Sequence, residues 1–373
     1  MGEQRILQKN FRIPWSQPNI TEDEVQVALN TLRSGWPSRG AVTEDFEALI
    51  SEYLSSNVVV VNSGSSALMC ALIAHGIRPK DRVVVPAYTF VASASIPKIL
   101  GAELIVADVD RETFNVSPEA VEDLVKKNGV KAVIVVDVAG LPVDIEAFIE
   151  LSKRYHFILI EDAAEALGAE YKHRKVGSFD HTTIFSFQTA KQITTVEGGC
   201  IVTSDKNVAE RCRQISNYGR SKKARYVHEI LGLNLRITDL QSAIGIIQFK
   251  KLEDHIRRRN EIAGEYRRKI QRLEYQRIPS YVTRHSYLMF TAITQNNAMR
   301  DRWVRELTAR GVEARTTWTP IHMQPCFPEL GILNLPNAEY IFDRAITLPI
   351  YNSMTYEDAA MVIEAAGAVS DKG

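Results

Sequence analysis

The stretch TTIFSFQTAKQITTVEGGC, residues 182–200, is the part of the sequence from which the fold can be predicted. Residues 183–187 are apolar and rich in β-branched and aromatic side chains, which is typical of a buried strand. Lys191 follows this strand directly, and Gly-Gly then opens a second apolar strand at 200–203. The apolar neighbours of the lysine in the chain are Phe185, Phe187 and Ile193. Because such surroundings disfavour an ammonium and a neutral amine attacks aldehydes, Lys191 is a candidate nucleophile.

Length and composition indicate a globular protein with more than one domain. The chain has 373 residues, of which 45% are hydrophobic and 24% are charged. Lysine and arginine number 45, as do aspartate and glutamate, so the formal net charge is zero. A neutral chain has no electrostatic footprint for nucleic acid or for an anionic membrane. We therefore expect neither of these partners.

The cysteines and the N-terminal segment indicate where in the cell the protein is located. The four cysteines are scattered, without the spacing of metal ligands, so we predict no metal site and a reducing environment. The first residues, MGEQRILQKNFRIP, lack the apolar core of a signal peptide. No apolar run approaches the ~20 residues of a membrane span. These features favour a cytoplasmic protein.

Alternating strands and helices predict an α/β fold. Strands are expected at 58–61, 82–85, 104–106, 133–136 and 157–160, and the segments between them have helical patterns. This rhythm is typical of a mostly parallel sheet that is covered on both faces.

A second, smaller region should follow the sheet. A long helix at 239–266 leads to a strand at 286–294, a helix at 299–310 and a last helix at 356–366. We therefore expect two domains. The first comprises residues 1–250 and begins with an N-terminal arm that reaches about Pro14, and the second comprises residues 251–373.

A turn rich in glycine and serine, NSGSS at 62–66, links the predicted strand 58–61 to a helix. A helix that begins at such a turn presents free backbone amides and the positive end of its dipole, which bind phosphate. The turn has neither the Gly-Lys-Ser/Thr of a Walker loop nor a GxGxxG motif. It is either a phosphate-binding turn or an ordinary capped start of a helix.

Two further candidates stand where predicted strands end. Asp162 follows the strand 157–160, at the edge of the sheet where ligands of α/β proteins bind. Its carboxylate could hold a cationic nitrogen, or it could cap the helix that follows. Phe90 follows another strand, and its ring could stack on a planar ligand or belong to the core.

These features together match pyridoxal 5′-phosphate (PLP). The phosphate needs the amide and hydroxyl donors of 62–66, and the pyridine nitrogen needs a carboxylate such as Asp162. The ring needs an aromatic face such as Phe90, and the aldehyde needs the amine of Lys191. We therefore predict a PLP site.

With these motifs the sequence resembles the DegT/DnrJ/EryC1/StrS family of PLP-dependent, fold-type I sugar aminotransferases, from about Ile13 to Ala366. The motifs are SGWPSRG at 34–40, NSGSSAL at 62–68, PAYTFVASA at 86–94, EDAAEALGA at 161–169, FSFQTAKQITTVEGG at 185–199 and GLNLRITDLQSAIG at 232–245. The EDAAEALG segment and the chain length are similar to the GDP-perosamine synthase branch of the family. The resemblance implies a large domain with a mostly parallel, seven-stranded sheet and a smaller C-terminal α/β domain.

The resemblance also implies roles for individual residues. Lys191 would form the Schiff base with PLP and move the proton, and Asp162 would pair with the pyridine nitrogen. The further cofactor ligands would be Gly64, Ser65 and Ser186 on the phosphate and Phe90 on the ring. Asn234 would reach the phosphate of the neighbouring subunit's cofactor, in a homodimer with shared active sites. Glu165 stands near the cofactor's O3′, where many relatives carry Gln or His, so its role stays open.

The implied reaction moves an amino group from an amino acid, expected to be glutamate, to a nucleotide-linked keto-deoxysugar. The product would enter the synthesis of polysaccharide, O-antigen or glycosylated metabolites. Candidate substrate ligands are Arg39, Tyr88, Gln188, Arg220, Arg236, Arg315 and His322.

Two other functions remain as alternatives. A PLP- or PMP-dependent sugar dehydratase of the same family would carry His in place of Lys191. A non-catalytic regulatory protein with this fold should have lost Asp162, Lys191 or the 62–66 turn, and all three are present.

Overall fold

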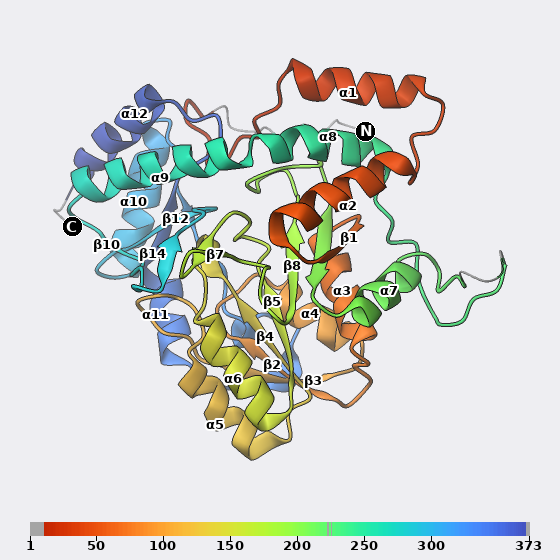
Figure 1. The fold of residues 1–373 in the computed structure, drawn as a ribbon. Helices are drawn as coiled ribbons and strands as arrows, with labels where there is room; N and C mark the ends of the chain where they lie inside the picture. Colours follow the sequence, from red (N-terminus) through yellow and green to blue (C-terminus); the bar gives the residue numbers. More distant parts are fainter. Residues whose placement is uncertain (1–10, 222–223, 225, 371–373) are drawn as a thin grey trace, which may run out of the picture.

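The computed structural model describes residues 11–221, 224 and 226–370 (Figure 1). Part of the predicted N-terminal arm, residues 1–10, lies outside this range. Among the described residues, no helix is both long enough and apolar enough to cross a membrane.

A seven-stranded sheet forms the centre of the larger part of the molecule, with the strand order β1-β9-β8-β5-β4-β2-β3. Strand β9 is antiparallel to β1 and β8, and the other pairs of neighbours are parallel. The strands are β1 (Asn57–Val61), β2 (Arg82–Pro86), β3 (Glu103–Ala107), β4 (Ala132–Val136), β5 (Ile158–Asp162), β8 (Thr182–Ser186) and β9 (Gly199–Thr203). The mostly parallel sheet predicted from the sequence is confirmed.

Helices cover both faces of this sheet. Helices α3 and α4 lie on one face and α5 and α6 on the other, and α7 packs against α3. Their bounds are α3 (Gly64–Ala74), α4 (Ala92–Ile99), α5 (Pro118–Asn128), α6 (Ile145–Tyr155) and α7 (Lys206–Ile215). Since both faces are covered, strands such as β4 are buried along their whole length, which explains their continuous runs of valine and isoleucine.

An outer layer is formed by α1 (Glu22–Arg33), α2 (Ala41–Leu54) and α8 (Asp239–Lys250). The buried carboxylate of Asp239 accepts hydrogen bonds from the amide of Gly40 at 2.7 Å and from the hydroxyl of Thr43 at 2.6 Å. This contact fixes the start of α2 to α8.

The C-terminal part has an antiparallel sheet of its own, in the order β10-β12-β14-β13. Its strands are β10 (Glu274–Tyr275), β12 (Phe290–Ile293), β13 (Arg315–Thr316) and β14 (Ala345–Leu348). Its helices are α9 (Leu252–Lys269), α10 (Asn297–Ala309), α11 (Pro336–Arg344) and α12 (Tyr356–Gly367). The smaller α/β unit is thus confirmed, whereas a domain boundary at residue 250 stays a prediction. One strand of this part, β11 (Val282–Arg284), pairs with β6 (Glu170–Tyr171) of the larger part, and β6 pairs with β7 (Arg174–Lys175).

Two elements differ from the prediction. The single helix expected at 239–266 is two helices, α8 and α9, which meet at Lys251, where the amide bonds to the Gln248 carbonyl. The strand expected at 286–294 is limited to β12, because Ser286 is bonded instead to Gly140 of the larger part.

Candidate active site

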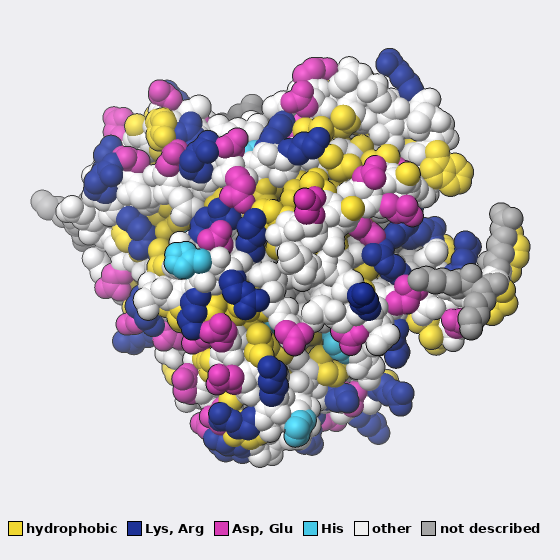
Figure 2. All heavy atoms as spheres, in the orientation of Figure 1, with side chains coloured by type: hydrophobic (Ala, Val, Ile, Leu, Met, Phe, Trp, Pro, Cys, Tyr) yellow, Lys and Arg dark blue, Asp and Glu magenta, His cyan; other side chains and the backbone are white. Residues whose placement is uncertain are grey.

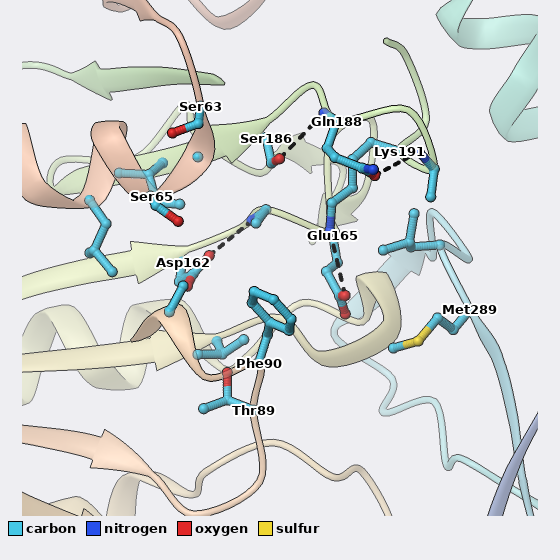
Figure 3. Close-up of a pocket in the computed structure, with 18 of the residues that line it drawn as sticks. Ser63, Ser65, Thr89, Phe90, Asp162, Glu165, Ser186, Gln188, Lys191 and Met289 are labelled. Atoms are coloured by element: carbon cyan, nitrogen blue, oxygen red, sulfur yellow. Dashed lines mark hydrogen bonds and ion pairs between the residues drawn. The ribbon is translucent and has the colours of Figure 1, made fainter. Parts of the chain in front are cut away.

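A cavity of about 500 Å³ opens at the carboxyl edge of the large sheet (Figure 3). Strands β1, β2, β4, β5 and β8 run in the same direction, so the residues that follow them meet at this edge. Nine predicted site residues line the cavity: Gly64, Ser65, Phe90, Asp162, Glu165, Ser186, Gln188, Lys191 and Arg315.

The start of α3 and the end of β8 form one corner of the cavity. The Ser63 hydroxyl caps α3 by accepting a hydrogen bond from the Ser66 amide at 3.1 Å, which leaves the amides of the first turn, at Gly64 and Ser65, directed at the cavity. A Cβ on Gly64 would lie 2.9 Å from the Cβ of Ser186. Glycine is therefore required here, because it lets the Ser186 hydroxyl stand beside the helix N-terminus. This corner has the donors that a phosphate needs.

Asp162 is the last residue of β5 and is buried. One carboxylate oxygen accepts a hydrogen bond from the Ser93 hydroxyl at 2.7 Å, and the other accepts one from the Ala164 amide at 3.2 Å. Burial raises the pKa of Asp162, so its charge lacks a full counter-ion in the protein alone. A cationic ring nitrogen would supply that counter-ion.

Phe90 lies between β2 and α4 and lines the cavity, where 56% of its surface is exposed. Figure 3 shows its ring standing between Asp162 and Glu165. An exposed aromatic face beside a buried carboxylate can stack on a planar cationic ring.

Lys191 lies on a turn that is closed by backbone hydrogen bonds. The amide of Phe187 bonds to the Gly198 carbonyl and the amide of Lys191 to the Gln188 carbonyl, both at 2.8 Å. A Cβ on Gly199 would lie 2.6 Å from the carbonyl oxygen of Phe185, so this turn needs its glycine. In Figure 3 the lysine side chain points toward Glu165, and the lysine Nζ lies 3.7 Å from a carboxylate oxygen.

Glu165 follows β5 and is also buried. Its second carboxylate oxygen accepts a hydrogen bond from the Ala139 amide at 2.8 Å. Ala139 has a φ of 62°, a left-handed conformation that is uncommon for a residue with a side chain. Burial raises the pKa of Glu165, and the charge of Lys191 opposes this effect.

The other predicted residues lie outside the cavity of a single chain. Asn234 is exposed beside Asn217, and Arg236 donates to the Asn217 side chain at 2.7 Å. Arg39 pairs with Glu47, and Arg220 is exposed. His322 lies 3.2 Å from Glu339, and Tyr88 is buried against Phe114 and Trp318. Their roles as ligands stay predictions.

Sequence reasoning did not single out several residues that complete the site. Ser93 holds Asp162, and the Ala139 amide holds Glu165. Four further side chains form the wall on the side of the C-terminal part: Trp15, Leu288, Met289 and Trp318. Ser93 lies within the PAYTFVASA motif and could have been proposed, whereas the wall comes from distant segments and has no local signal.

A phosphate corner, a buried acid, an exposed aromatic ring and a lysine in one cavity define a site that fits PLP. The donors, the uncompensated carboxylate and the amine each match one group of this cofactor. The fold and the site thus define a PLP-dependent enzyme of fold type I.

Comparison with known proteins gives the family. Residues 18–366 match the DegT/DnrJ/EryC1/StrS aminotransferase family. A GDP-perosamine synthase from Caulobacter vibrioides is 33% identical over 365 residues, which cover 96% of this chain and 98% of the relative. A GDP-perosamine synthase from Escherichia coli O157:H7 is 34% identical over 354 residues, which cover 94% and 97%.

Solved structures of sugar aminotransferases have the same fold as this chain. The PLP form of a proposed sugar aminotransferase from Streptococcus pneumoniae superimposes with a TM-score of 0.89 at 27% identity, over 96% of this chain and 98% of that one. Its PMP form also gives a TM-score of 0.89, at 26% identity, over 96% of this chain and 97% of that one. The chain belongs to the DegT/DnrJ/EryC1/StrS aminotransferase family. It is an enzyme of the sugar aminotransferase class, and its cofactor is PLP, as predicted.

Proposed function

We propose that this enzyme transfers an amino group from glutamate to the keto group of a nucleotide-linked deoxysugar, with Lys191 as the residue that binds PLP covalently. The proposal rests on one observation. Lys191, Asp162 and the corner formed by Gly64 and Ser186 lie in the same cavity. The amine of Lys191 would hold PLP through the aldehyde carbon of the cofactor, with loss of one water molecule.

Each residue has a distinct task in this reaction. When bound, PLP supplies an aldehyde that accepts the amino group and a ring that withdraws electrons from the reacting carbon. Asp162 would keep the ring nitrogen protonated, and the first turn of α3 with Ser186 would hold the phosphate. Lys191, as a free amine, would take the proton from the donor carbon and return it to the neighbouring carbon.

The substrate class is supported by the relatives and by the charges of the cavity. The two relatives reported above are GDP-perosamine synthases, which favours a nucleotide-linked sugar for this chain. Among the described residues that line the cavity, Lys191 and Arg315 carry the positive charges. Arg315 is the candidate for binding the donor carboxylate or the diphosphate. The product would enter polysaccharide or O-antigen synthesis.

A homodimer would complete this site. Asn234 lies outside the cavity of its own chain, on an exposed segment whose apolar side chains include Tyr226, Leu231 and Leu233. Figure 2 shows further hydrophobic side chains around α1 and α2, and the exposed ones in α1 are Val25, Leu29 and Leu32. Such surfaces are typical of subunit interfaces. We propose that the Asn234 segment reaches the active site of the partner subunit.

All four cysteines are free thiols, which supports a cytoplasmic location.

The experiment is an absorption spectrum of the purified protein with PLP, before and after glutamate is added, followed by borohydride reduction and peptide mass spectrometry. We expect a visible band that disappears with glutamate, and a PLP mass on Lys191. Lys191→Ala should show neither. Lys98→Ala, which removes a surface lysine paired with Glu329, is the matched control.

The rival functions predict other outcomes. Incubation with GDP-linked and other nucleotide keto-sugars should give an aminated product by mass spectrometry. A dehydrated sugar without added nitrogen would favour the dehydratase. A wild-type protein that neither forms the band nor responds to glutamate would favour the regulatory protein and overturn the proposal.

A further inference from the structure

The Lys191 amine faces one carboxylate at ion-pair distance. Its Nζ lies 3.7 Å from an oxygen of Glu165, and 16% of the lysine side chain and 8% of the glutamate side chain are exposed. Little water can therefore screen this pair, so the interaction between the two charges is stronger than at a protein surface.

Both ends of the glutamate are fixed by other segments. The carboxylate is held by the Ala139 amide, and the backbone carbonyl of Glu165 accepts a hydrogen bond from the Ser286 hydroxyl at 2.9 Å. The side-chain amide of Gln192, the residue after the lysine, donates to the same carbonyl and to Ser286. A Cβ on Gly140 would lie 2.2 Å from the Ser286 hydroxyl, so these segments meet without free space. Glu165 is thus held at both its backbone and its carboxylate.

We propose that Glu165 is a positioning residue that acts as the counter-ion of Lys191 while the lysine carries the proton taken from the substrate carbon. This inference rests on the proposed function, and it assigns a role that the resemblance left open.

The proton balance explains why a counter-ion is needed. The neutral lysine takes one proton when the C–H bond breaks, and the electron pair of that bond stays with the substrate. The lysine is then an ammonium on a side chain that is only 16% exposed, which is unfavourable unless a negative charge stands beside it. Glu165 supplies that charge at a fixed distance, and the lysine becomes neutral again when it passes the proton to the neighbouring carbon. No proton leaves the site in this cycle.

Other charged and titratable groups also face this pair. Asp162 of β5 interacts electrostatically with both Glu165 and Lys191, and Asp137 and Tyr88 are affected by Glu165. Of these groups, Asp162 is assigned to the cofactor nitrogen and Asp137 and Tyr88 lie outside the cavity lining. Glu165 is the group among these with a carboxylate oxygen at ion-pair distance from the lysine nitrogen.

The experiment measures how readily Lys191 reacts with acetic anhydride over a series of pH values, with peptide mass spectrometry as the readout. The full-length protein is loaded with pyridoxamine phosphate, so that the lysine is not attached to the cofactor. Wild type is compared with Glu165→Gln and Glu165→Asp. Glu197→Gln is the matched control, because Glu197 also lines the cavity and no ion pair with Lys191 is found for it in the described structure.

We expect the midpoint of the Lys191 profile to move to lower pH by about 1 to 3 units in Glu165→Gln, since an opposite charge at this distance favours the ammonium by that amount. Glu165→Asp should lie between the two, and Glu197→Gln should match wild type. An unchanged midpoint in Glu165→Gln, or an equal change in Glu197→Gln, would overturn the inference. If Glu165→Gln does not retain pyridoxamine phosphate, the same comparison is made on the cofactor-free proteins.

Failure of this inference can be told apart from failure of the proposed function. Borohydride reduction of wild type and of Glu165→Gln in the presence of PLP should place the cofactor on Lys191 in both. If PLP is attached to Lys191 in both proteins and their labelling profiles are identical, only the counter-ion role of Glu165 is wrong. If PLP is not attached to Lys191 in wild type, the proposed function itself is wrong.

Discussion

The hydroxyl of Ser93 lies 2.7 Å from a carboxylate oxygen of Asp162, and both side chains are buried. Ser93 belongs to α4, which follows β2, whereas Asp162 ends β5. The acid that is proposed to pair with the cofactor nitrogen is therefore held by a residue that lies 69 positions earlier in the chain. Its orientation depends on a tertiary contact.

Replacement of this hydroxyl should weaken cofactor binding. In Ser93→Ala, Asp162 loses a hydrogen bond to a charged group, which is worth about 1.5–3 kcal/mol. We expect the dissociation constant of PLP, measured by absorbance titration, to rise at least about tenfold. Ser95→Ala in the same helix is the control, and an equal loss in both variants would show that the hydroxyl is not the cause.

Gly64→Ala should damage the phosphate corner. The new methyl group would lie 2.9 Å from the Cβ of Ser186, so α3 and β8 must move apart and the amides of the first turn leave Ser186. We expect weaker binding of PLP and of inorganic phosphate, with circular dichroism unchanged.

The matched control for this glycine lies in α9. A Cβ on Gly264 would meet nothing within 4 Å, so Gly264→Ala should bind PLP normally and gain about 0.5–1 kcal/mol in the free energy of unfolding. Normal PLP affinity in Gly64→Ala would contradict the predicted corner.

Asp137 should make the stability of the enzyme depend on pH. This residue follows β4 and is fully buried, and burial beside Glu161 raises its pKa well above the ordinary value. A carboxyl group whose pKa is raised by folding favours the folded state below its unfolded pKa, and this contribution is lost as pH rises through the folded pKa. The ionised aspartate therefore destabilises the protein on the alkaline side.

Asp137→Asn removes this titration and keeps the shape of the side chain. We expect the variant to be more stable than wild type at pH 8, and the difference to shrink at pH 5. Urea unfolding of both proteins, loaded with PLP, measures this. A variant that is less stable at pH 8, or a difference that is equal at both pH values, would disagree with a buried, uncompensated charge.

A mixture of two inactive variants should recover activity if the site is shared. Lys191→Ala lacks the attachment residue, and Asn234→Ala lacks the residue that is proposed to reach the partner's cofactor. A mixed dimer has one site that combines Lys191 of one chain with Asn234 of the other. After unfolding and refolding together, roughly a quarter of all sites should be complete.

The measurement is the glutamate half-reaction before and after mixing. No recovery, together with a normal dimer by light scattering, would show that Asn234 acts within its own chain or not at all. Full activity of Asn234→Ala alone would also exclude a role of Asn234 in a shared site.

The sequence by itself determined the elements whose signals are local. Runs of valine and isoleucine specified the strands of the parallel sheet, because these strands are buried on both faces. The turn at Gly64, the acid Asp162 and the lysine Lys191 could be predicted as a PLP site, since each follows a strand and parallel strands end at one edge. The resemblance to the family added Ser186 as an expected phosphate ligand and left the role of Glu165 open.

Only the tertiary structure decided which of these residues meet, because their contacts join segments that are far apart in the chain. It brought Glu165 to Lys191, Ser93 to Asp162 and Trp15 to the cavity wall, and it left Arg39 and His322 with other partners. In the structure the predicted long helix is interrupted at Lys251, and two elements that were not predicted, α11 and β14, are present. Both are short, so their sequence patterns are too weak to predict without the packing that buries them. Local sequence specifies strands, caps and turns through backbone preferences, whereas distances between side chains depend on how the whole core packs.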